Sequence, residues 1–406
     1  MRVSTANTYD IGITLLQRRQ SELSEAQAQL TSGKRVQRAS DDPVAAARAE
    51  RALAGASRVV ADQRTAQSSE AIMVQTESTL GDAGELMQQA REAVIAAGNA
   101  TYGAAERAGL AEKLKQIRDQ LFKVANRSDG AGTYLFGGQG STQPPLVDSR
   151  PDASVPTEQT GVRFVGSRGN SQTEAGTNLP LALDGAAVWT SARTGNGVFE
   201  TRATGTNGGA WIDAGVVTNP TAITGNTYSV VYNTATSQFD ISNTSTLPAT
   251  ALPSQNYVSG QAIEFDGMSL TITGKPLNGE TFNVLPSTST LNVFGVLDKA
   301  VADLGTPKSG SALAQVIGDN LRNIDSAMGK LQAARSVAGE AMARIESEVG
   351  QLATQKLNYD TDRANAEDLD MVEAISRFDS KQTGYDAALK SYSMVQRMSL
   401  FQYLNV

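Results

Sequence analysis

The sequence predicts an α+β fold, in which helices from both ends of the chain form a coiled-coil bundle and a β-rich domain is inserted between them. Composition changes twice along the 406 residues. Residues 1–140 and 291–406 are rich in Ala, Gln, Glu, Arg and Leu, which are good helix formers, whereas residues 141–290 contain more Gly, Thr, Ser, Asn and Pro. The outer blocks are therefore predicted to be helical, and the middle block to consist of strands and turns.

Apolar residues in the outer blocks recur at alternating steps of four and three residues, which is the spacing of a coiled-coil seam. The longest series runs from residue 317 to 352, and Arg335 fills its one position without an apolar side chain. Shorter series run through residues 73–97 and 110–124. Three seams in one chain predict a helical bundle built from both outer blocks. The longest series consists of Ile317, Leu321, Ile324, Met328, Leu331, Ala338, Met342, Ile345, Val349 and Leu352.

A fourth apolar series lies near the N-terminus and is predicted to end where Gly33 can close a helix. The next helix is predicted to begin at Pro43, because the Asp42 carboxylate can accept hydrogen bonds from the free amides of the first turn and proline lacks an amide there. The acidic segment 360–370 is interpreted as a turn with a helix start near residue 366, since the helix dipole favours acids in the first turn. The N-terminal series consists of Tyr9, Leu16, Leu23 and Leu30, with Ile13 beside it.

Short apolar segments between turn formers predict the strands of the middle block. The sequence leaves open whether this block is one unit or two. Two proline-containing segments, residues 216–226 and 245–256, could each be a boundary or a loop. The predicted strands lie in residues 227–233, 238–242, 262–274 and 281–286.

The composition argues against catalysis and against binding of cofactors or metals. The chain has no Cys and no His, which removes disulfides, thiolate nucleophiles and the commonest zinc ligands. The Gly-containing segments 137–140 and 267–276 lack the spacing of a phosphate-binding loop, and the acids of 360–370 lack the ligand spacing of a calcium loop. A serine–lysine dyad stays open as a route to catalysis, because the sequence does not show which side chains are neighbours. We expect a protein that is not an enzyme and needs no cofactor.

Charge and hydropathy narrow the range of partners. The net charge is -7 and the basic residues are scattered between acidic ones, so no nucleic-acid partner is expected. No run of about eighteen apolar residues occurs, and the first residues contain neither a signal-peptide core nor a small-residue cleavage site. We therefore expect no membrane insertion and no cleaved secretory signal.

The last residues are unusually apolar for a chain terminus, where polar and mobile residues are the rule. Tyr385, Leu389 and Tyr392 share one face of the predicted helix, but the apolar residues after them are spread around its circumference. Such a helix needs neighbours all round, and the N-terminal segment 1–33 can cover only part of it. The remainder is predicted to contact other subunits; the alternative is that this helix closes the bundle of its own monomer. The predicted subunit-assembly residues are Ile13, Leu16, Leu23, Leu30, Leu389, Tyr392, Val395, Met398, Leu400, Phe401 and Leu404.

Several segments resemble the flagellin superfamily of bacterial flagella: the opening MRVST, residues 15–47, YLFGGQGSTQPP at 134–145, and residues 385–405. Within this family, SDDPVAAA at 40–47, YLFGG and the ending LFQYLNV are more similar to the branch that forms the hook–filament junction than to flagellin itself. The resemblance implies a flagellin-like fold, in which the terminal helices line an inner tube, a helical rod surrounds them and the β-rich domain faces outward.

The resemblance also implies a structural, polymerising subunit of the bacterial flagellum, secreted through the flagellar type III apparatus to the cell exterior. Its expected partners are other copies of the chain in a ring, the preceding hook-associated protein, flagellin, and a cytosolic export chaperone at the C-terminal helix. Two alternatives stay open, namely that the chain is the filament subunit itself, or that it is a type III-exported tip or adhesin protein.

These observations together predict three parts of the chain. Residues 1–39 and 366–406 form a terminal coiled coil, which is the core of assembly and is disordered in the free monomer, because an isolated helix pair of this size barely offsets its ordering entropy. Residues 40–140 and 291–365 form a helical rod domain. Residues 141–290 form the inserted β-rich outer domain.

Overall fold

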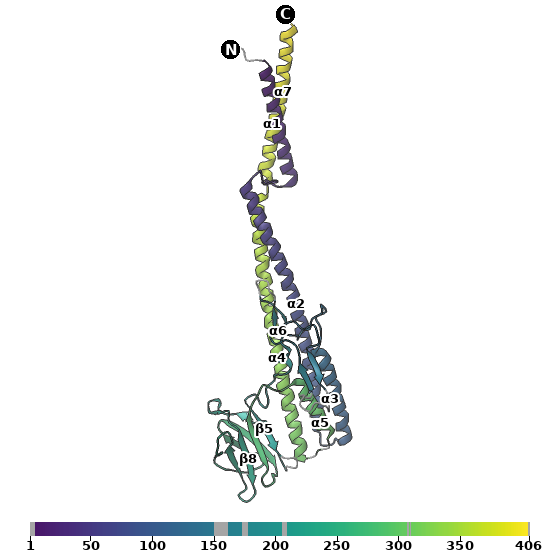
Figure 1. Ribbon diagram of the computed structural model, residues 1–406, viewed down its shortest axis with the longest axis vertical. Helices are drawn as coiled ribbons and strands as arrows, with labels where there is room; N and C mark the ends of the chain where they lie inside the picture. Colours follow the sequence, from purple (N-terminus) through teal and green to yellow (C-terminus); the bar gives the residue numbers. More distant parts are fainter. Residues whose placement is uncertain are drawn as a thin grey trace. The chain divides into compact units, whose positions relative to one another are not determined.

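A computed structural model describes residues 5–149, 161–172, 178–204, 209–306, 308 and 310–404. For residues 5–9, 149 and 395–404 it describes the backbone alone. Helices form the terminal parts of the chain and strands form the middle part, so the predicted α+β class is confirmed (Figure 1).

The chain divides into two compact units. Unit 1 comprises Met1–Thr65 and Glu348–Val406, and unit 2 comprises Ala66–Ser347. The long helices α2 (Pro43–Ala97) and α6 (Gly310–Glu367) contribute residues to both units. The predicted division into three parts stays a prediction about how the chain behaves in assembly.

Unit 1 contains α1 (Thr5–Ser32) and α7 (Met371–Leu404), which pack against each other (Figure 1), together with parts of α2 and α6. The predicted end of the first helix is confirmed: α1 ends at Ser32, and Gly33 has a φ of 69°, which favours glycine. The predicted start at Pro43 is confirmed too. Asp42 Oδ1 accepts hydrogen bonds from the amides of Val44 at 3.2 Å and Ala45 at 3.0 Å.

The helical part of unit 2 contains α3 (Ala104–Ala125), α5 (Val293–Gly305) and the adjoining parts of α2 and α6. All eight residues of the alternating series within residues 73–97 are buried, and the apolar residues of the series 317–352 are buried or half-buried. Arg335, which interrupts the second series, is exposed, and its Nε donates to Glu77 Oε1 on α2 at 2.6 Å. The apolar seams are thus packing surfaces, and an ion pair bridges the interruption. The eight residues are Met73, Thr76, Leu80, Ala83, Met87, Ala90, Val94 and Ala97.

The first part of the middle block packs onto these helices. Its first antiparallel strand pair contributes Leu146 and Val162, and its short helix contributes Trp189, to the same apolar core as α3 and α5. Trp189 is fully buried, with its ring stacked on Phe294 of α5 at a centroid distance of 5.7 Å. Residues far apart in sequence therefore close this core. The elements are β1 (Leu146–Ser149), β2 (Gly161–Phe164), β3 (Ser171–Gln172), β4 (Pro180–Ala182) and α4 (Gly185–Trp189).

Residues 199–286 form a β-sandwich with a second apolar core, which includes Tyr228, Phe239 and Phe282. One antiparallel sheet has the strand order β10-β9-β8-β14-β5, with β11 beside β9; the other has the order β12-β13-β6, with β7 beside β13. The elements are β5 (Phe199–Thr204), β6 (Ala210–Ile212), β7 (Val216–Val217), the 3-10 helix η1 (Pro220–Ala222), β8 (Tyr228–Asn233), β9 (Gln238–Asn243), β10 (Thr250–Ala251), β11 (Gln255–Asn256), β12 (Ala262–Phe265), β13 (Met268–Gly274) and β14 (Thr281–Pro286).

The strands predicted from the sequence all lie in this β-sandwich and are confirmed. The segment 262–274 forms a hairpin, whose turn residues Asp266 and Gly267 have φ values of 44° and 77°. The two segments left open as boundaries, 216–226 and 245–256, are short strands and loops of the same β-sandwich. The division within the middle block lies elsewhere. Its first part, up to Trp189, joins the helical core, and residues 199–286 form the second core.

Asp303 on α5 is held between two lysines. Its carboxylate accepts hydrogen bonds from Lys299 Nζ at 2.6 Å, Lys308 Nζ at 3.1 Å and Asn320 Nδ2 at 3.2 Å. Burial alone would raise the pKa of Asp303, but the hydrogen bonds and charges of Lys299 and Lys308 outweigh it and hold the pKa below its usual value. The charged carboxylate therefore favours the folded state at neutral pH.

Replacement of this residue, Asp303→Asn, is expected to lower the free energy of unfolding of unit 2 by about 1 kcal/mol at neutral pH. Because the folded-state pKa is depressed, the unfolded chain takes up the proton first as the pH falls, and the wild-type advantage disappears below about pH 4. Urea unfolding of both proteins over this pH range measures the effect. Glu112→Gln is the control, because Glu112 is 61% exposed and 3.9 Å from Lys115. A difference that does not change with pH contradicts the prediction.

Candidate assembly interface

One face of α1, which repeats every seven residues, packs against α7. Leu16, Leu23 and Leu30 are half-buried on this face. Ala26, which precedes Leu30 by one helical turn, is 5% exposed. Three predicted assembly residues therefore contribute to the pairing of the terminal helices within one chain, and their contacts with other subunits stay a prediction.

Two contacts fix how α7 lies on α1. Gly12 faces the ring of Tyr392, because a Cβ atom at residue 12 would lie 3.2 Å from Tyr392 Cδ2. Farther along the pair, Lys381 Nζ donates to the backbone carbonyl of Glu22 at 3.3 Å. Tyr392, another predicted assembly residue, is half-buried by this arrangement. The absence of a side chain at residue 12 lets its aromatic ring approach the α1 backbone.

Other apolar side chains of the helix pair are exposed to solvent. Ile13 is 42% exposed and Leu389 is 46% exposed, so these two predicted assembly residues are accessible in the single chain. Met394 is 65% exposed. Five further apolar residues of this helix pair are exposed and were not among the predicted assembly residues. Their apolar side chains on the predicted terminal helices are the signal that could have found them. They are Ile11, Leu15, Met371, Val372 and Ile375.

The remaining predicted assembly residues lie near the C-terminus. The backbone of α7 is helical through Leu404, but these side chains lie outside the described residues. Their role therefore stays a prediction from the sequence. They are Val395, Met398, Leu400, Phe401 and Leu404.

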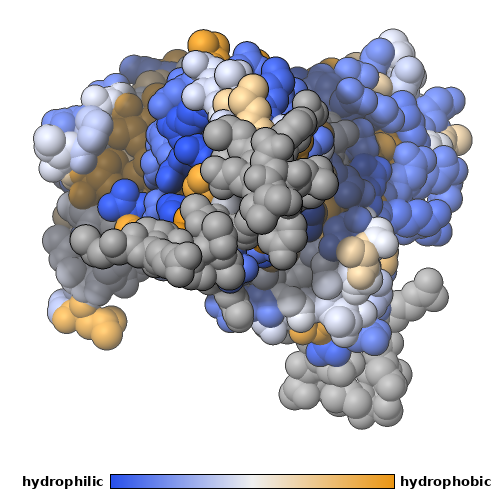
Figure 2. Space-filling view, turned by 90° about the horizontal axis from the view of Figure 1, so that it is seen from above, coloured by the Kyte–Doolittle hydropathy of each residue, from blue (hydrophilic) through white to orange (hydrophobic). Residues whose placement is uncertain are grey.

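Hydrophobic residues form small groups on the face of the molecule drawn in Figure 2. There the orange groups are separated by blue, hydrophilic residues of the described part of the chain. The exposed apolar side chains of α1 and α7 are likewise interspersed with polar ones. Contact with a neighbour would thus bury several short apolar segments together with the polar residues between them.

The elbow, which we define as residues 33–42 and 367–370, joins the terminal helices to α2 and α6. The amide of Leu369 donates to the carbonyl of Gly33 at 3.0 Å, and the amide of Arg35 donates to the carbonyl of Glu367 at 2.7 Å. Lys34 Nζ lies 3.0 Å from Glu367 Oε1. Backbone hydrogen bonds and an ion pair therefore hold the two chain segments in register where they pass each other.

Both helices that leave the elbow begin with an aspartate cap. The amide of Ala45 and the guanidinium of Arg35, which donates to Asp42 Oδ2 at 3.2 Å, hold the pKa of Asp42 below its usual value. Asp370 Oδ1 accepts hydrogen bonds from the amides of Val372 at 3.0 Å and of Glu373 at 3.2 Å. The turn and helix start that the sequence places near residue 366 are wrong, because α6 continues through Glu367; the next helix begins at Met371, directly after this second cap.

The described part of unit 1 thus presents a packing surface of apolar side chains and capped helix ends. Across all the described residues, no group of three or more His, Cys, Asp or Glu side chains is placed to hold a metal ion. None of the described helices is long and apolar enough to cross a membrane.

Comparison with known proteins matches both ends of the chain to one family. Residues 3–141 match the model of the bacterial flagellin N-terminal helical region, and residues 321–404 match that of the bacterial flagellin C-terminal helical region. The sequence is 26% identical to flagellar hook-associated protein 3 of Salmonella typhimurium, over 99% of each chain. It is 24% identical to flagellar hook-associated protein 3 of Escherichia coli, again over 99% of each chain.

Solved structures show the same fold. The crystal structure of FlgL from Xanthomonas campestris matches 76% of this chain and 99% of its own, with a TM-score of 0.66 and 24% identity. That of the flagellar junction protein FlgL from Legionella pneumophila matches 70% of this chain and 94% of its own, with a TM-score of 0.62 and 25% identity. Flagellin E of Vibrio cholerae is 30% identical, but over only 29% of this chain and 31% of that protein.

Proposed function

Because this chain belongs to the bacterial flagellin family, we propose that it is the structural subunit that joins the flagellar hook to the flagellin filament. Its full-length relatives are flagellar hook-associated proteins, which supports a structural role in the flagellum. The observation that carries the junction assignment is the extent of the similarity. Hook-associated protein 3 matches 99% of the chain, including the β-rich middle, whereas flagellin E matches 29%.

The proposed mechanism is polymerisation through the terminal helices. Copies of the chain pack in a ring, with one surface of the ring on the preceding hook-associated protein and the other presented to flagellin. Ile13, Leu389 and Met394, which are exposed in the single chain, become buried between subunits. Each Å² of apolar surface removed from water contributes roughly 25 cal/mol, so many modest contacts around a ring add up to a stable junction.

The terminal helices α1 and α7 are proposed to fold when the exported chain reaches the junction. The helix pair α1–α7 has much exposed apolar surface and few partners within its own chain, so ordering it is more favourable once neighbours cover it. The chain is proposed to leave the cell through the flagellar type III apparatus without cleavage. Before export, a cytosolic chaperone is proposed to bind the C-terminal helix. Family membership supports both steps.

Deletion of the gene tests the proposed function. We expect hooks without filaments in electron micrographs, and flagellin in the culture medium as unpolymerised protein; a plasmid copy of the gene should restore the filaments. If filaments are lost and no flagellin of another kind is found outside the cells, the chain is the filament subunit. Unchanged flagella would instead favour the other alternative, a type III-exported tip or adhesin protein. Either result rejects the junction assignment.

A further inference from the structure

The β-sandwich has an apolar core that is separate from the helical core of unit 2. The two groups of buried residues share no member. Trp211 on β6 is only half-buried and belongs to neither group, although it faces α6 as part of the lining of two cavities. The β-sandwich is therefore not held on α6 by a shared apolar interior.

Its hydrogen bonds with α6 come from a polar stripe, which we define as Ser311, Gln315, Asp319, Arg322 and Ser326. These residues are spaced by three or four positions, so they share one face of the helix. Ser311 Oγ donates to the carbonyl of Gly209 at 2.8 Å, and Gln315 Oε1 accepts from the amide of Ile212 at 2.8 Å. At the other end, Ser326 Oγ donates to the carbonyl of Arg193, which precedes the β-sandwich in the chain. The helix thus binds the backbone at the edge of the β-sandwich and of the segment that leads into it.

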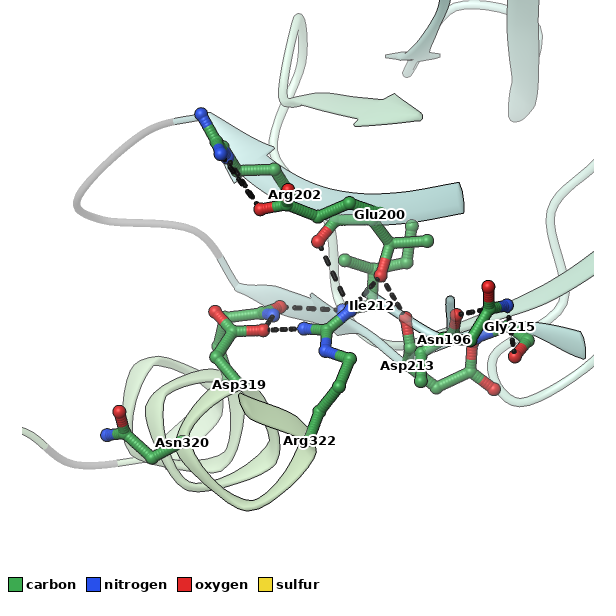
Figure 3. A network of polar contacts seen from close by, with 12 residues as sticks. Asn196, Glu200, Arg202, Ile212, Asp213, Gly215, Asp319, Asn320 and Arg322 are labelled. Atoms are coloured by element: carbon green, nitrogen blue, oxygen red, sulfur yellow. Dashed lines mark hydrogen bonds and ion pairs between the residues drawn. The ribbon is translucent and has the colours of Figure 1, made fainter. Parts of the chain in front are cut away.

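Arg322 is the central member of the polar stripe. Figure 3 shows it beside Asp319 on α6, below the strand that carries Glu200 and Arg202. Its Nη1 donates to Thr201 Oγ1 at 2.6 Å and to the Thr201 carbonyl at 3.3 Å, while Nη2 pairs with Asp319. The side chain of Arg322 is 9% exposed. A charged group this well buried fixes the position of its partner strand, since few other arrangements satisfy all its donors.

Two cavities flank the polar stripe. One, of about 560 Å³, is lined by Asn196, Asp213 and Arg322, and the other, of about 530 Å³, by Arg107 and Leu313; Trp211 lines both. Both are partly open to solvent, so side chains do not fill this part of the contact completely. The contact between α6 and the β-sandwich therefore combines the hydrogen bonds of the polar stripe with two incompletely filled pockets, in which Trp211 lies near Leu313 and Leu321, and it is not closed by a continuous core.

The covalent connections of the β-sandwich form a tether, which contacts α6 through the hydrogen bond from Ser326 to Arg193. Its two segments, residues 190–194 and 288–291, run antiparallel to each other. The amide of Ala192 donates to the Leu291 carbonyl at 3.0 Å, the Leu291 amide donates to the Ala192 carbonyl at 2.9 Å, and the Thr194 amide donates to the Thr288 carbonyl at 2.9 Å. None of these three hydrogen bonds involves a residue of α6.

We propose that the polar stripe is a latch, which holds the β-sandwich in one orientation on α6 and whose opening lets this domain turn on the tether with both cores intact. Opening exchanges protein hydrogen bonds for hydrogen bonds with water and leaves both apolar cores closed, so its free-energy cost is below that of unfolding either core. The latch does not depend on a role of the chain at the hook–filament junction.

A distance measurement between two spin labels tests the latch. The chain contains no Cys, so Thr236→Cys on the exposed β8–β9 turn and Gln120→Cys on the exposed face of α3 give two unique attachment sites. The latch variant combines Ser311→Ala, Gln315→Ala, Asp319→Asn and Arg322→Met, which removes both ends of the ion pair and leaves no unpaired buried charge. We expect one narrow distribution in the parent protein and a distribution about twofold wider or more in the latch variant.

The matched control is Arg335→Gln, which removes another arginine of α6 whose partner, Glu77, lies on α2. Its distance distribution should stay narrow. Equal widths in the parent and the latch variant, narrow or broad, would overturn the proposal, and so would equal broadening by the control.

Hydrogen exchange distinguishes an opened latch from an unfolded domain. The Ile212 amide, which is bonded to Gln315, should exchange about tenfold faster in the latch variant. The amides of Val230 and Ile241, which pair within the β-sandwich core, should keep their parent rates. If the exchange of all three amides becomes faster together, the polar stripe is part of the fold of the β-sandwich, and the latch proposal is wrong.

Discussion

Cells whose only copy of the protein carries Leu389→Asp and Met394→Asp are expected to assemble hooks without filaments. Both side chains are exposed in the single chain, so the variant should fold and be exported. In the proposed ring the same positions are buried between subunits, where an unpaired carboxylate is strongly unfavourable. We expect the amount of the protein in sheared flagella to fall about tenfold or more. Immunoblots of the medium measure export separately, because exported but unassembled protein collects there.

Val258→Asp and Leu277→Asp together provide the matched control. Each residue is 56% exposed on the β-sandwich, so this pair places the same charges on a surface that the proposal leaves outside the assembly core. The control should restore filaments to the deletion strain. If the Leu389 and Met394 variant is incorporated as well as the control, α7 does not form the subunit interface at these positions.

Phe294→Ala should destabilise unit 2 by about 3–5 kcal/mol, which is the usual cost of removing a buried aromatic ring. Phe294 is fully buried between two aromatic partners: it stacks on Trp189 and meets Phe122 edge-on at a centroid distance of 6.0 Å. Removing the ring leaves a cavity that these rigid neighbours cannot fill. Urea unfolding followed by Trp189 fluorescence measures the loss, in a Trp211→Phe background that leaves one tryptophan.

Phe239→Ala is the control for this second variant. Phe239 is equally buried, but in the core of the β-sandwich. The Trp189 transition should keep its midpoint in this control. A loss below about 1 kcal/mol for Phe294→Ala would show that the helical core does not depend on the aromatic stack.

Local patterns predicted the long helices and the central strands well. The seams on α2 and α6 are visible in the sequence because each helix packs one continuous face for many turns, so its apolar residues keep a fixed period. The strands β8, β9, β12, β13 and β14 are bounded by turn residues and carry β-branched or aromatic side chains. The start of α2 was predictable because the Asp42 cap acts within a single turn.

Contacts between distant residues were not predictable in the same way. Trp189 joins the helical core through Phe294, and nothing in the residues around either one indicates the other. The strands β1 to β4 are too short to show a period. On α6, the polar stripe looks like an ordinary solvated face in sequence, since only the folded chain brings Arg322 to Thr201.

For the candidate interface, the sequence indicated which helices carry surplus apolar residues but not which residues stay uncovered. Leu16, Leu23 and Leu30 are half-buried against α7, whereas Ile13 and Leu389 are exposed. That distinction depends on the rotation of each helix about its axis, which the packing partner sets.

The elbow imposes an order on folding. Arg35 Nη2 donates to the carbonyl of Ala366 at 2.9 Å, across 331 positions of the sequence, and the backbone hydrogen bonds beside it span similar separations. Unit 2 is continuous in sequence, so its cores close with shorter chain loops. A chain that emerges N-terminus first must hold residues 33–42 without their partners until nearly all of it has emerged. Completion of the elbow is therefore a late event in the maturation of each subunit.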